Sequence, residues 1–234
     1  APAAYELWSR HMNHNPANPK WENRDRFILS GGHGSMLLYS LLHLFGYGNL
    51  SIDDIKNFRQ LDSLTPGHPE YGHTVGIEAT TGPLGQGMAM AVGMAMAEAH
   101  LSAVFNKEGY PVVDHYTYVL GGDGCMMEGI SSECFSLAGT LGLNKLIVLY
   151  DSNNITADGD ISKTFDDNIT DRFTSMNWNV IKVRNSESVS EITSAIEKAK
   201  KSNKPTIIVI ESVIGKYSKY EGTNYILSLI HISE

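Results

Sequence analysis

Residues 116–150, YTYVLGGDGCMMEGISSECFSLAGTLGLNKLIVLY, decide the fold class of this chain. The stretch opens with an apolar and aromatic run, Tyr116–Leu120, and closes with a second apolar run, Leu146–Tyr150. Runs that are apolar throughout predict strands buried on both faces. Between them, Ile130–Leu141 has a helical pattern. A strand, a helix and a strand in this order predict parallel neighbours in one sheet.

The same alternation continues in both directions along the chain. Further strands are expected at Arg26–Leu29, Val180–Val183 and Thr206–Ile210, and further helices at Met36–Phe45, Ile52–Phe58, Gly87–Phe105 and Val189–Lys201. The sequence contains no internal repeat and no low-complexity linker. It therefore predicts one α/β domain with a doubly wound, mostly parallel sheet and helices on both faces.

The composition argues against several classes of protein. With 42% hydrophobic and 19% charged residues, the chain is typical of a globular domain rather than a disordered one. Its 26 acidic residues outnumber 18 basic ones, giving a formal charge of −8, and no run of Lys or Arg stands out. Because a nucleic-acid backbone needs a basic surface, we expect no nucleic-acid partner.

Cysteine usage and apolar patterning bear on the compartment. Cys125 and Cys134 are too few for a disulfide framework, which favours a reduced, cytoplasmic location. The first residues, Ala1–Trp8, lack the features of a signal peptide. The longest uncharged stretch, Ala79–Ala97, is dense in Gly, Ala and Met, so we interpret it as a buried helix and expect no membrane span.

A glycine-rich segment with one acidic residue, Gly121–Gly129, directly follows the strand that ends near Leu120. Its glycines permit a sharp turn and a close approach of backbone to ligand, and the next helix offers free N–H groups suited to a diphosphate. Asp123 alone would repel phosphate, so a divalent cation between the two is expected. The alternative is that Asp123 merely caps a turn or the next helix.

A second polar segment, Tyr150–Thr156, comes after the next strand. Asn153 offers an amide oxygen and Ile155 a backbone carbonyl. With Asp123, two diphosphate oxygens and a water, they would supply the roughly six oxygens that Mg²⁺ prefers, and Ca²⁺ is an alternative. Asp123 and Asn153 are 30 residues apart, which fits one strand–helix–strand step. The alternative for this segment is a polar turn.

Gly-Asp-Gly with an Asn about 30 residues later is similar to the signature of thiamine-diphosphate enzymes. Further motifs resemble transketolase in the order of that family: Ser30–Gly34, Thr65–Glu70, Thr80–Gly87 and Gly129–Glu133. The resemblance runs from about Ala1 to about Thr223. It implies that 1–223 is the diphosphate-binding domain of that family and that 224–234 is a non-family tail.

The resemblance also implies roles for two histidines and an arginine. His33 and His68 match residues that line the channel near the thiazolium carbon, where they contact substrate and, for His33, the cofactor as well. An imidazole with a near-neutral pKa can donate a hydrogen bond or shuttle a proton there, so both are candidate catalytic residues. Arg59 resembles an arginine that holds a sugar phosphate. The alternatives are turn-capping or surface histidines and a solvated helix end.

Four further residues are implied as cofactor contacts. Gly82 and Leu84 match residues that touch the aminopyrimidine ring, and Gly124 lies in the diphosphate segment beside Asp123. Glu128 matches an acidic residue in a carboxylate network between the cofactor sites of a dimer. Tight packing at a helix start, and compensation of a helix dipole by Glu128, are the alternatives.

The family resemblance implies transfer of a two-carbon ketol unit between sugar phosphates in the pentose phosphate pathway, with thiamine diphosphate and Mg²⁺ or Ca²⁺. The glutamate that activates the cofactor in that family lies in a pyrimidine-binding domain, which we do not find here. We therefore expect a pyrimidine-binding partner domain, in a homodimer or a split-subunit heteromer. The alternative is a non-catalytic binding module or a subunit of a split enzyme.

Both ends of the chain depart from the family pattern. A Gly-His-Pro-Gly-like motif expected just before Ala1–Ala4 is absent, and Asn224–His231 does not match the family residues that come after the position of Thr223. We interpret residues 224–234 as an artefactual tail, with an edge strand or a docking tail as the alternatives.

Overall fold

The computed structural model describes residues 1–157 and 159–227 and contains one five-stranded sheet. The strands lie in the order β1-β2-β3-β7-β6, and every neighbouring pair is parallel. Their bounds are Arg26–Leu29 (β1), Thr117–Gly122 (β2), Leu146–Ser152 (β3), Asn179–Val183 (β6) and Thr206–Glu211 (β7). The short strands β4 (Ile155–Thr156) and β5 (Gly159–Asp160) form a separate antiparallel pair. The predicted α/β class and parallel sheet are confirmed.

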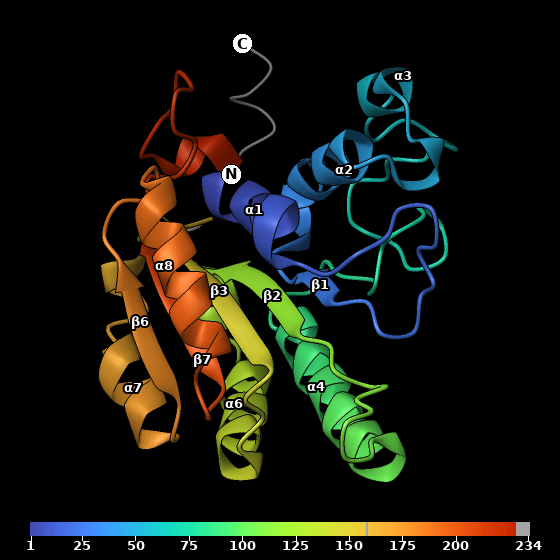
Figure 1. Ribbon diagram of the computed structural model, residues 1–234. Coiled ribbons are helices and arrows are strands. Elements are labelled where there is room, and N and C mark those ends of the chain that lie inside the picture. Colours follow the sequence, from blue (N-terminus) through green and yellow to red (C-terminus); the bar gives the residue numbers. More distant parts are fainter. Residues whose placement is uncertain (158, 228–234) are drawn as a thin grey trace.

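Helices cover both faces of the sheet (Figure 1). The helical bounds are Pro2–Glu6 (α1), Ser35–Leu44 (α2), Ile52–Lys56 (α3), Gln86–Phe105 (α4), Asp123–Met127 (α5), Gly129–Leu141 (α6), Ile169–Ser175 (α7) and Val189–Lys200 (α8). Short helices of other types are the π-helical η1 (Leu7–His11) and the 3₁₀ turns η2 (Gly32–Gly34), η3 (Tyr47–Asn49), η4 (Ile161–Lys163) and η5 (Asn224–Leu227).

Strand β3 shows how the alternation of side chains builds two cores. Ile147 and Leu149 pack into the core that α1, η1, α2 and α8 cover, whereas Val148 and Tyr150 pack into the core under α4, α6 and α7. Because successive strand residues point to opposite faces, a central strand must be apolar throughout to fill both cores. The continuous apolar runs in the sequence thus have their physical explanation.

The glycine-rich segment after β2 differs from the expected sharp turn. Gly121 and Gly122 remain in β2, and α5 begins at Asp123 without a glycine of positive φ between them. A methyl group at Gly121 would overlap Met88 Cε of α4, so the missing side chain lets α4 pack closely against the end of β2. The sequence also did not reveal α1, α5 and α7, which are only five to seven residues long.

Helix α4 is buried along one face only, which corrects the expectation of a fully buried helix. Its sheet-facing side buries Met88, Ala91 and Ala95, whereas large apolar side chains on its other side are exposed. Within the described ranges, α4 alone is long and apolar enough to cross a membrane, a test that core helices of soluble proteins also pass. Because its buried Glu98 pairs with Lys145 at 2.6 Å, we interpret α4 as a helix that packs on the sheet.

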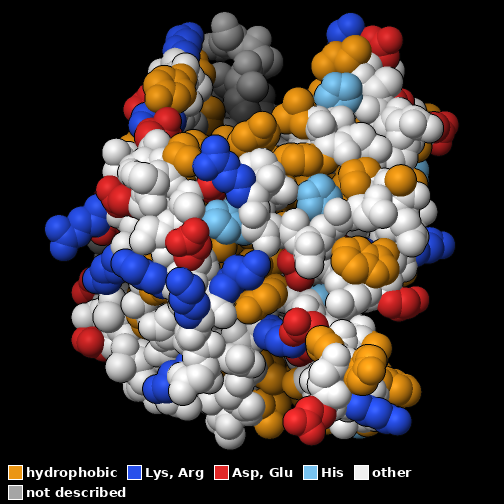
Figure 2. Space-filling model, in the orientation of Figure 1, with side chains coloured by type: hydrophobic (Ala, Val, Ile, Leu, Met, Phe, Trp, Pro, Cys, Tyr) orange, Lys and Arg blue, Asp and Glu red, His pale blue; other side chains and the backbone are white. Residues whose placement is uncertain are grey.

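Acidic and basic side chains lie mixed on the face that α1 and α8 cover (Figure 2). At the upper edge of the molecule, α2 and α3 rise on one side and the residues after β7 on the other (Figure 1). Of the tail expected at 224–234, residues 224–227 form η5, and 228–234 lie outside the described residues.

Candidate diphosphate and metal site

Asp123 lies where β2 ends and α5 begins, and its side chain is only 2% exposed. The hydroxyl of Tyr150 donates to Oδ1, and the backbone N–H groups of Asn153 and Asn154 donate to Oδ2 at 3.2 and 2.8 Å. Burial raises the pKa of Asp123, although these three hydrogen bonds oppose the shift. The site therefore holds a desolvated carboxylate at the carboxyl end of a central strand.

Asn153 comes just after β3 and faces Asp123 across the sheet edge. The register of the two strands brings Asp123 and Asn153 close together, because Gly122 of β2 pairs with Asp151 of β3 and the residues that follow lie side by side. The Asn153 side-chain oxygen accepts from the Ile155 N–H at 3.1 Å, and its Nδ2 donates to Asp151 at 3.0 Å. The structure thus brings together Asp123, Asn153 and Ile155, the three residues that the sequence analysis offered as metal ligands.

The donor set of this cluster fits a hard divalent cation. Carboxylate and amide oxygens are the ligands that Mg²⁺ and Ca²⁺ take in proteins. A carboxylate has about four lone-pair positions, so three hydrogen bonds leave Asp123 one position for a cation. In the described part of the chain, no group of three or more His, Cys, Asp or Glu side chains is arranged to hold a metal. A site here would therefore depend on neutral oxygens and on the ligand itself.

The loop from Thr81 to Gly85 packs against Gly124 and Glu128, which follow Asp123 in the chain. A methyl group at Gly124 would lie 2.8 Å from Leu84 Cδ1, and one at Gly85 would lie 2.7 Å from Glu128 Cβ. The Thr81 hydroxyl donates to the Leu29 carbonyl at 2.7 Å and ties the loop to β1. Leu84, Gly124 and Glu128 are thereby brought together, as expected for residues of one site.

The same loop continues to the candidate channel residues. Gly82 adopts a φ of +157°, and a methyl group there would lie 3.4 Å from the His68 ring. His33, in η2, keeps part of its surface exposed but is surrounded by protein on its other sides. This partial loss of hydration lowers its pKa, and the neighbouring charges of His68 and Arg59 lower it further. The structure therefore places both histidines and the arginine in one electrostatic neighbourhood.

Arg59 lies beyond the end of α3 in a left-handed conformation with φ +64°. Its N–H donates to the Thr65 carbonyl at 3.0 Å, and its guanidinium lies against Gly67 and 5.2 Å from the ring centre of Phe58. A non-glycine residue in this region carries strain that the surrounding structure must hold. Arg59 is exposed and lies three residues after the last residue of α3, so the solvated helix end that the sequence allowed as an alternative stays open.

Helix α2 carries two anchors that the sequence analysis missed. The buried Tyr39 hydroxyl donates to the carbonyls of Pro66 and His68 at 2.8 and 3.2 Å, and Ser35 donates to the Gly67 carbonyl at 2.8 Å. These bonds hold the turn that presents His68. The available signal was a Ser and a Tyr, four residues apart, within an otherwise apolar helical stretch.

A second missed group supports Asn153. Asp151 accepts from Asn153 Nδ2 and from the hydroxyl of Ser212, which lies just after β7. Tyr150, which donates to Asp123, was seen only as the last residue of an apolar run. Each of these polar residues stands at or just after the end of a strand, where their sequence positions could have indicated a site.

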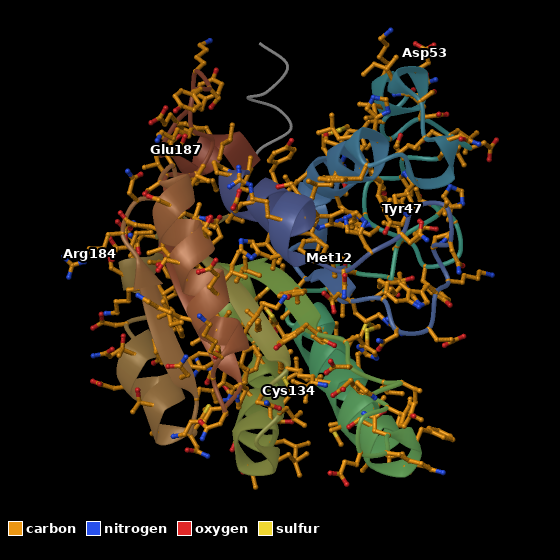
Figure 3. The ribbon with its side chains drawn as sticks, viewed as in Figure 1. Met12, Tyr47, Asp53, Cys134, Arg184 and Glu187 are labelled. Atoms are coloured by element: carbon orange, nitrogen blue, oxygen red, sulfur yellow. The ribbon has the colours of Figure 1, made fainter. Side chains whose placement is uncertain are left out.

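Two surface hollows and the two cysteines contribute no residue to this site. The hollows, of about 230 and 650 Å³, are lined by β6 and α8 in one case and by Asn15–Pro19, Gly46–Asn49 and Val75 in the other, and contain no predicted site residue. Cys125 and Cys134 are free, and burial raises the pKa of Cys134 to about 11. Figure 3 shows Cys134 on α6, far from Glu187 at the opposite end of the molecule.

The family model "Transketolase, thiamine diphosphate binding domain" matches residues 1–226. A transketolase of Halalkalibacterium halodurans is 59% identical over 222 residues, covering 95% of this chain and 33% of that protein. A transketolase of Bacillus subtilis is 60% identical over 216 residues, covering 92% of this chain and 32% of that protein. The chain spans about a third of the length of these curated relatives.

Solved structures agree with the sequence comparisons. Transketolase from Leishmania mexicana superposes with a TM-score of 0.94 at 50% identity, over 96% of this chain and 34% of that one. Transketolase from Pichia stipitis in complex with sedoheptulose 7-phosphate gives 0.94 at 47% identity, over 96% and 33%. By these matches, the chain belongs to the transketolase thiamine diphosphate binding domain family.

Proposed function

We propose that this chain supplies the diphosphate and metal half of a transketolase site, which transfers a two-carbon ketol unit between sugar phosphates. One observation carries the proposal. The loop Thr81–Gly85 connects the Asp123–Asn153 cluster with the His33–His68 pair. A single ligand lying along that loop would reach both groups. The Pichia stipitis relatives were solved with sedoheptulose 7-phosphate, fructose 6-phosphate and xylulose 5-phosphate, which supports sugar phosphates as substrates.

In this proposal Asp123, Asn153 and the Ile155 carbonyl hold Mg²⁺ or Ca²⁺. The cation offsets the repulsion between the buried Asp123 carboxylate and a diphosphate. Gly124 has no side chain, so the backbone can approach the diphosphate. Gly82 and Leu84 contact the aminopyrimidine ring.

The cofactor contributes the difficult chemistry of the reaction. When bound, thiamine diphosphate supplies the nucleophilic carbon and the electron sink that two-carbon transfer requires. The lowered pKa of His33 favours a neutral imidazole at neutral pH, which can donate a hydrogen bond or accept a proton from a substrate hydroxyl. His68 acts beside it, and Arg59 binds the substrate phosphate.

The proposal requires a pyrimidine-binding domain and places the site between subunits. The face of α4 that the sheet leaves uncovered exposes Met90, Met96 and Leu101, and Met127 and Leu137 are exposed on α5 and α6. Several large apolar side chains exposed on neighbouring helices are typical of an interface. We infer a homodimer or a split-subunit heteromer, with Glu128 at the interface, in the cytoplasm and within the pentose phosphate pathway.

The activity test supplies a pyrimidine-binding domain together with saturating thiamine diphosphate and Mg²⁺. Xylulose 5-phosphate and ribose 5-phosphate should then yield sedoheptulose 7-phosphate, and Asp123→Ala should yield none. Absence of product from the unaltered chain, when cofactor binding is demonstrated in the same sample, would contradict the proposal. It would favour the second candidate, a binding module that does not catalyse the reaction.

A comparison of cofactor binding by two chain lengths tests the domain boundary. We propose that 1–223 acts as the diphosphate-binding domain and that 224–234 contributes nothing to it. A chain ending at Thr223 should bind the cofactor as the full chain does. Weaker binding by the shortened chain would show that the tail belongs to the domain.

A further inference from the structure

Asp151, the sixth residue of β3, links Asn153 to the end of strand β7. Its Oδ2 accepts from Asn153 Nδ2 at 3.0 Å, and its Oδ1 accepts from the hydroxyl of Ser212 at 2.5 Å. Ser212 is the first residue after β7, and its N–H donates to the Ser152 carbonyl at 3.0 Å. Register places them together, because Ser152 of β3 pairs with Glu211 of β7. A series of side-chain hydrogen bonds, from Ser212 to Asp151 to Asn153, therefore crosses the carboxyl ends of the neighbouring strands β7 and β3.

This arrangement fixes which end of the Asn153 amide faces which neighbour. An ionised carboxylate only accepts hydrogen bonds, so only the NH₂ group of Asn153 can face Asp151. The amide oxygen must then point to the other side, where the Ile155 N–H donates to it at 3.1 Å. Asn153 also donates its backbone N–H to Asp123, and Ile155 offers the third proposed ligand, so the residue lies beside the proposed cation site. A carbonyl oxygen has two lone pairs, and one remains for a cation.

Without Asp151, little would oppose a flip of the amide, since its oxygen and nitrogen are nearly equal in size. A flipped amide would present donors to the cation and would provide no ligand. Ser212 adds to this control by occupying the second carboxylate oxygen, which limits rotation of the Asp151 side chain. Groups behind the ligands of a metal site commonly set ligand orientation in this way.

We propose that Asp151 and Ser212 are positioning residues that orient the Asn153 amide so that its oxygen faces the cation. The inference rests on the proposed function for the identity of the cation site. The orientation itself exists without metal, so it can be measured independently.

The first measurement uses the metal-free full chain. The side-chain NH₂ signal of Asn153, assigned by its disappearance in Asn153→Ala, should show slowed hydrogen exchange in a ¹⁵N-edited NMR spectrum. Asp151→Asn and Ser212→Ala should both speed that exchange, and Ser212→Thr should restore it. Unchanged exchange in Asp151→Asn and Ser212→Ala would overturn the inference.

The second measurement is Mn²⁺ affinity in the presence of thiamine diphosphate, by titration calorimetry. Ser212→Ala changes no charge and should weaken Mn²⁺ binding about tenfold, the lower end of what such supporting residues contribute. Asp151→Asn should weaken it further, because a negative charge is lost as well. Glu211→Gln removes a charge from the same sheet edge, where the Glu211 side chain is exposed, and serves as the matched control. Thermal unfolding of each variant separates orientation from general loss of structure.

The outcomes distinguish this inference from the proposed function. Wild-type Mn²⁺ affinity in Ser212→Ala, alongside lost binding in Asp123→Ala, would overturn the positioning role and leave the metal site standing. Full Mn²⁺ binding by Asp123→Ala would refute the metal site itself, while the NMR exchange of Asn153 would still decide the orientation. Restoration of both readouts by Ser212→Thr would support the inference against a purely structural role.

Discussion

His115, just before β2, is 6% exposed, and its pKa is lowered to about 4. Burial is the main cause, and the cations Arg26, Lys145 and Arg24 add to it. Because the folded pKa lies below the unfolded value of 6.5, the unfolded chain binds the proton more readily as pH falls. Stability is therefore lost as pH falls through 6.5 toward 4, by about 2 kcal/mol between pH 7 and pH 5 at about 1.4 kcal/mol per pH unit.

Urea unfolding at pH 7 and pH 5 measures this loss, with His115→Gln as the comparison. The variant should lose about 2 kcal/mol less than the wild type over the same interval. Other titrating groups, such as Asp25 with its raised pKa, act equally on both proteins. The same pH dependence in both would show that His115 is not held neutral.

Residue types at the site were more predictable than their partners. Asp123 and Asn153 stood out because acidic and amide residues come directly after two apolar strands, and their meeting is a consequence of parallel register. The contacts of Tyr150, Asp151 and Ser212 were not predictable in this way, since each depends on neighbouring strands aligning to within one residue.

At the scale of single elements, the anchor between α2 and the turn carrying His68 is open to test. Tyr39→Phe removes the donor to the Pro66 and His68 carbonyls and should cost about 1–3 kcal/mol, because buried acceptors are left unpaired. The His68 and His33 ring signals in NMR should shift as the turn relaxes. In the matched control Tyr116→Phe, which loses a bond to the Lys200 carbonyl, those signals should stay in place. Unmoved signals in Tyr39→Phe would contradict the anchoring role.

Two glycines within helices should respond oppositely to the same substitution. Gly93 of α4 has open space around it, so Gly93→Ala should stabilise the protein by up to about 1 kcal/mol through helix propensity. A methyl group at Gly139 of α6 would collide with the Met176 carbonyl, so Gly139→Ala should destabilise by about 1–3 kcal/mol. Urea unfolding of both variants checks this, and a stabilised Gly139→Ala would show that α6 is less tightly packed.

Strands followed from the sequence more readily than short helices did. All five strands of the main sheet were predicted from short runs rich in apolar residues, and their bounds differ by at most two residues. The central strands are buried throughout most of their length, whereas β6 at the edge of the sheet contains Lys182 and buries only Val183. Helix α7 was missed although Asn168 caps it through the Asp171 N–H, since only Phe173 among its residues is buried. Helix α5 was missed because glycines suggested a turn where they actually provide close packing.

At the scale of the whole molecule, the exposed face of α4 should drive association of the chain. Leu101 on this face and Val189 on α8, across the sheet, are exposed to similar extents of 40% and 44%. Leu101→Lys should shift sedimentation velocity toward the monomer because it places a charge in the interface, whereas Val189→Lys should not. A wild-type chain that remains monomeric at high concentration would contradict the expected interface.

The convergence of distant segments could be predicted only in part from the sequence. Parallel topology placed the ends of β2 and β3 together, and the family resemblance implied that the His33, His68 and Gly82 segments join them. The left-handed conformation of Arg59 and the hydrogen bonds of Tyr39 arise from tertiary packing, which no local pattern encodes.

The central claim is that Asp123 holds a cation which in turn holds a diphosphate. Diphosphate brings about three negative charges and Asp123 adds another in a desolvated position, so binding without a cation is opposed by repulsion. Cofactor and metal should therefore each tighten the binding of the other by the same factor. Without pyrimidine contacts, we expect a dissociation constant of about micromolar to millimolar.

Titration calorimetry of thiamine diphosphate into the full chain, with Mg²⁺ and with a chelator, tests this claim most directly. The account predicts that binding depends on Mg²⁺, that Asp123→Ala abolishes it, and that Asn153→Ala weakens it less because a neutral amide adds no charge. Asp53→Ala, at an exposed position on α3 (Figure 3) where the side chain pairs with Lys56 of the same helix, should bind as the wild type does. Equal cofactor affinity with chelator and with Mg²⁺, or unaltered binding by Asp123→Ala, would contradict the account.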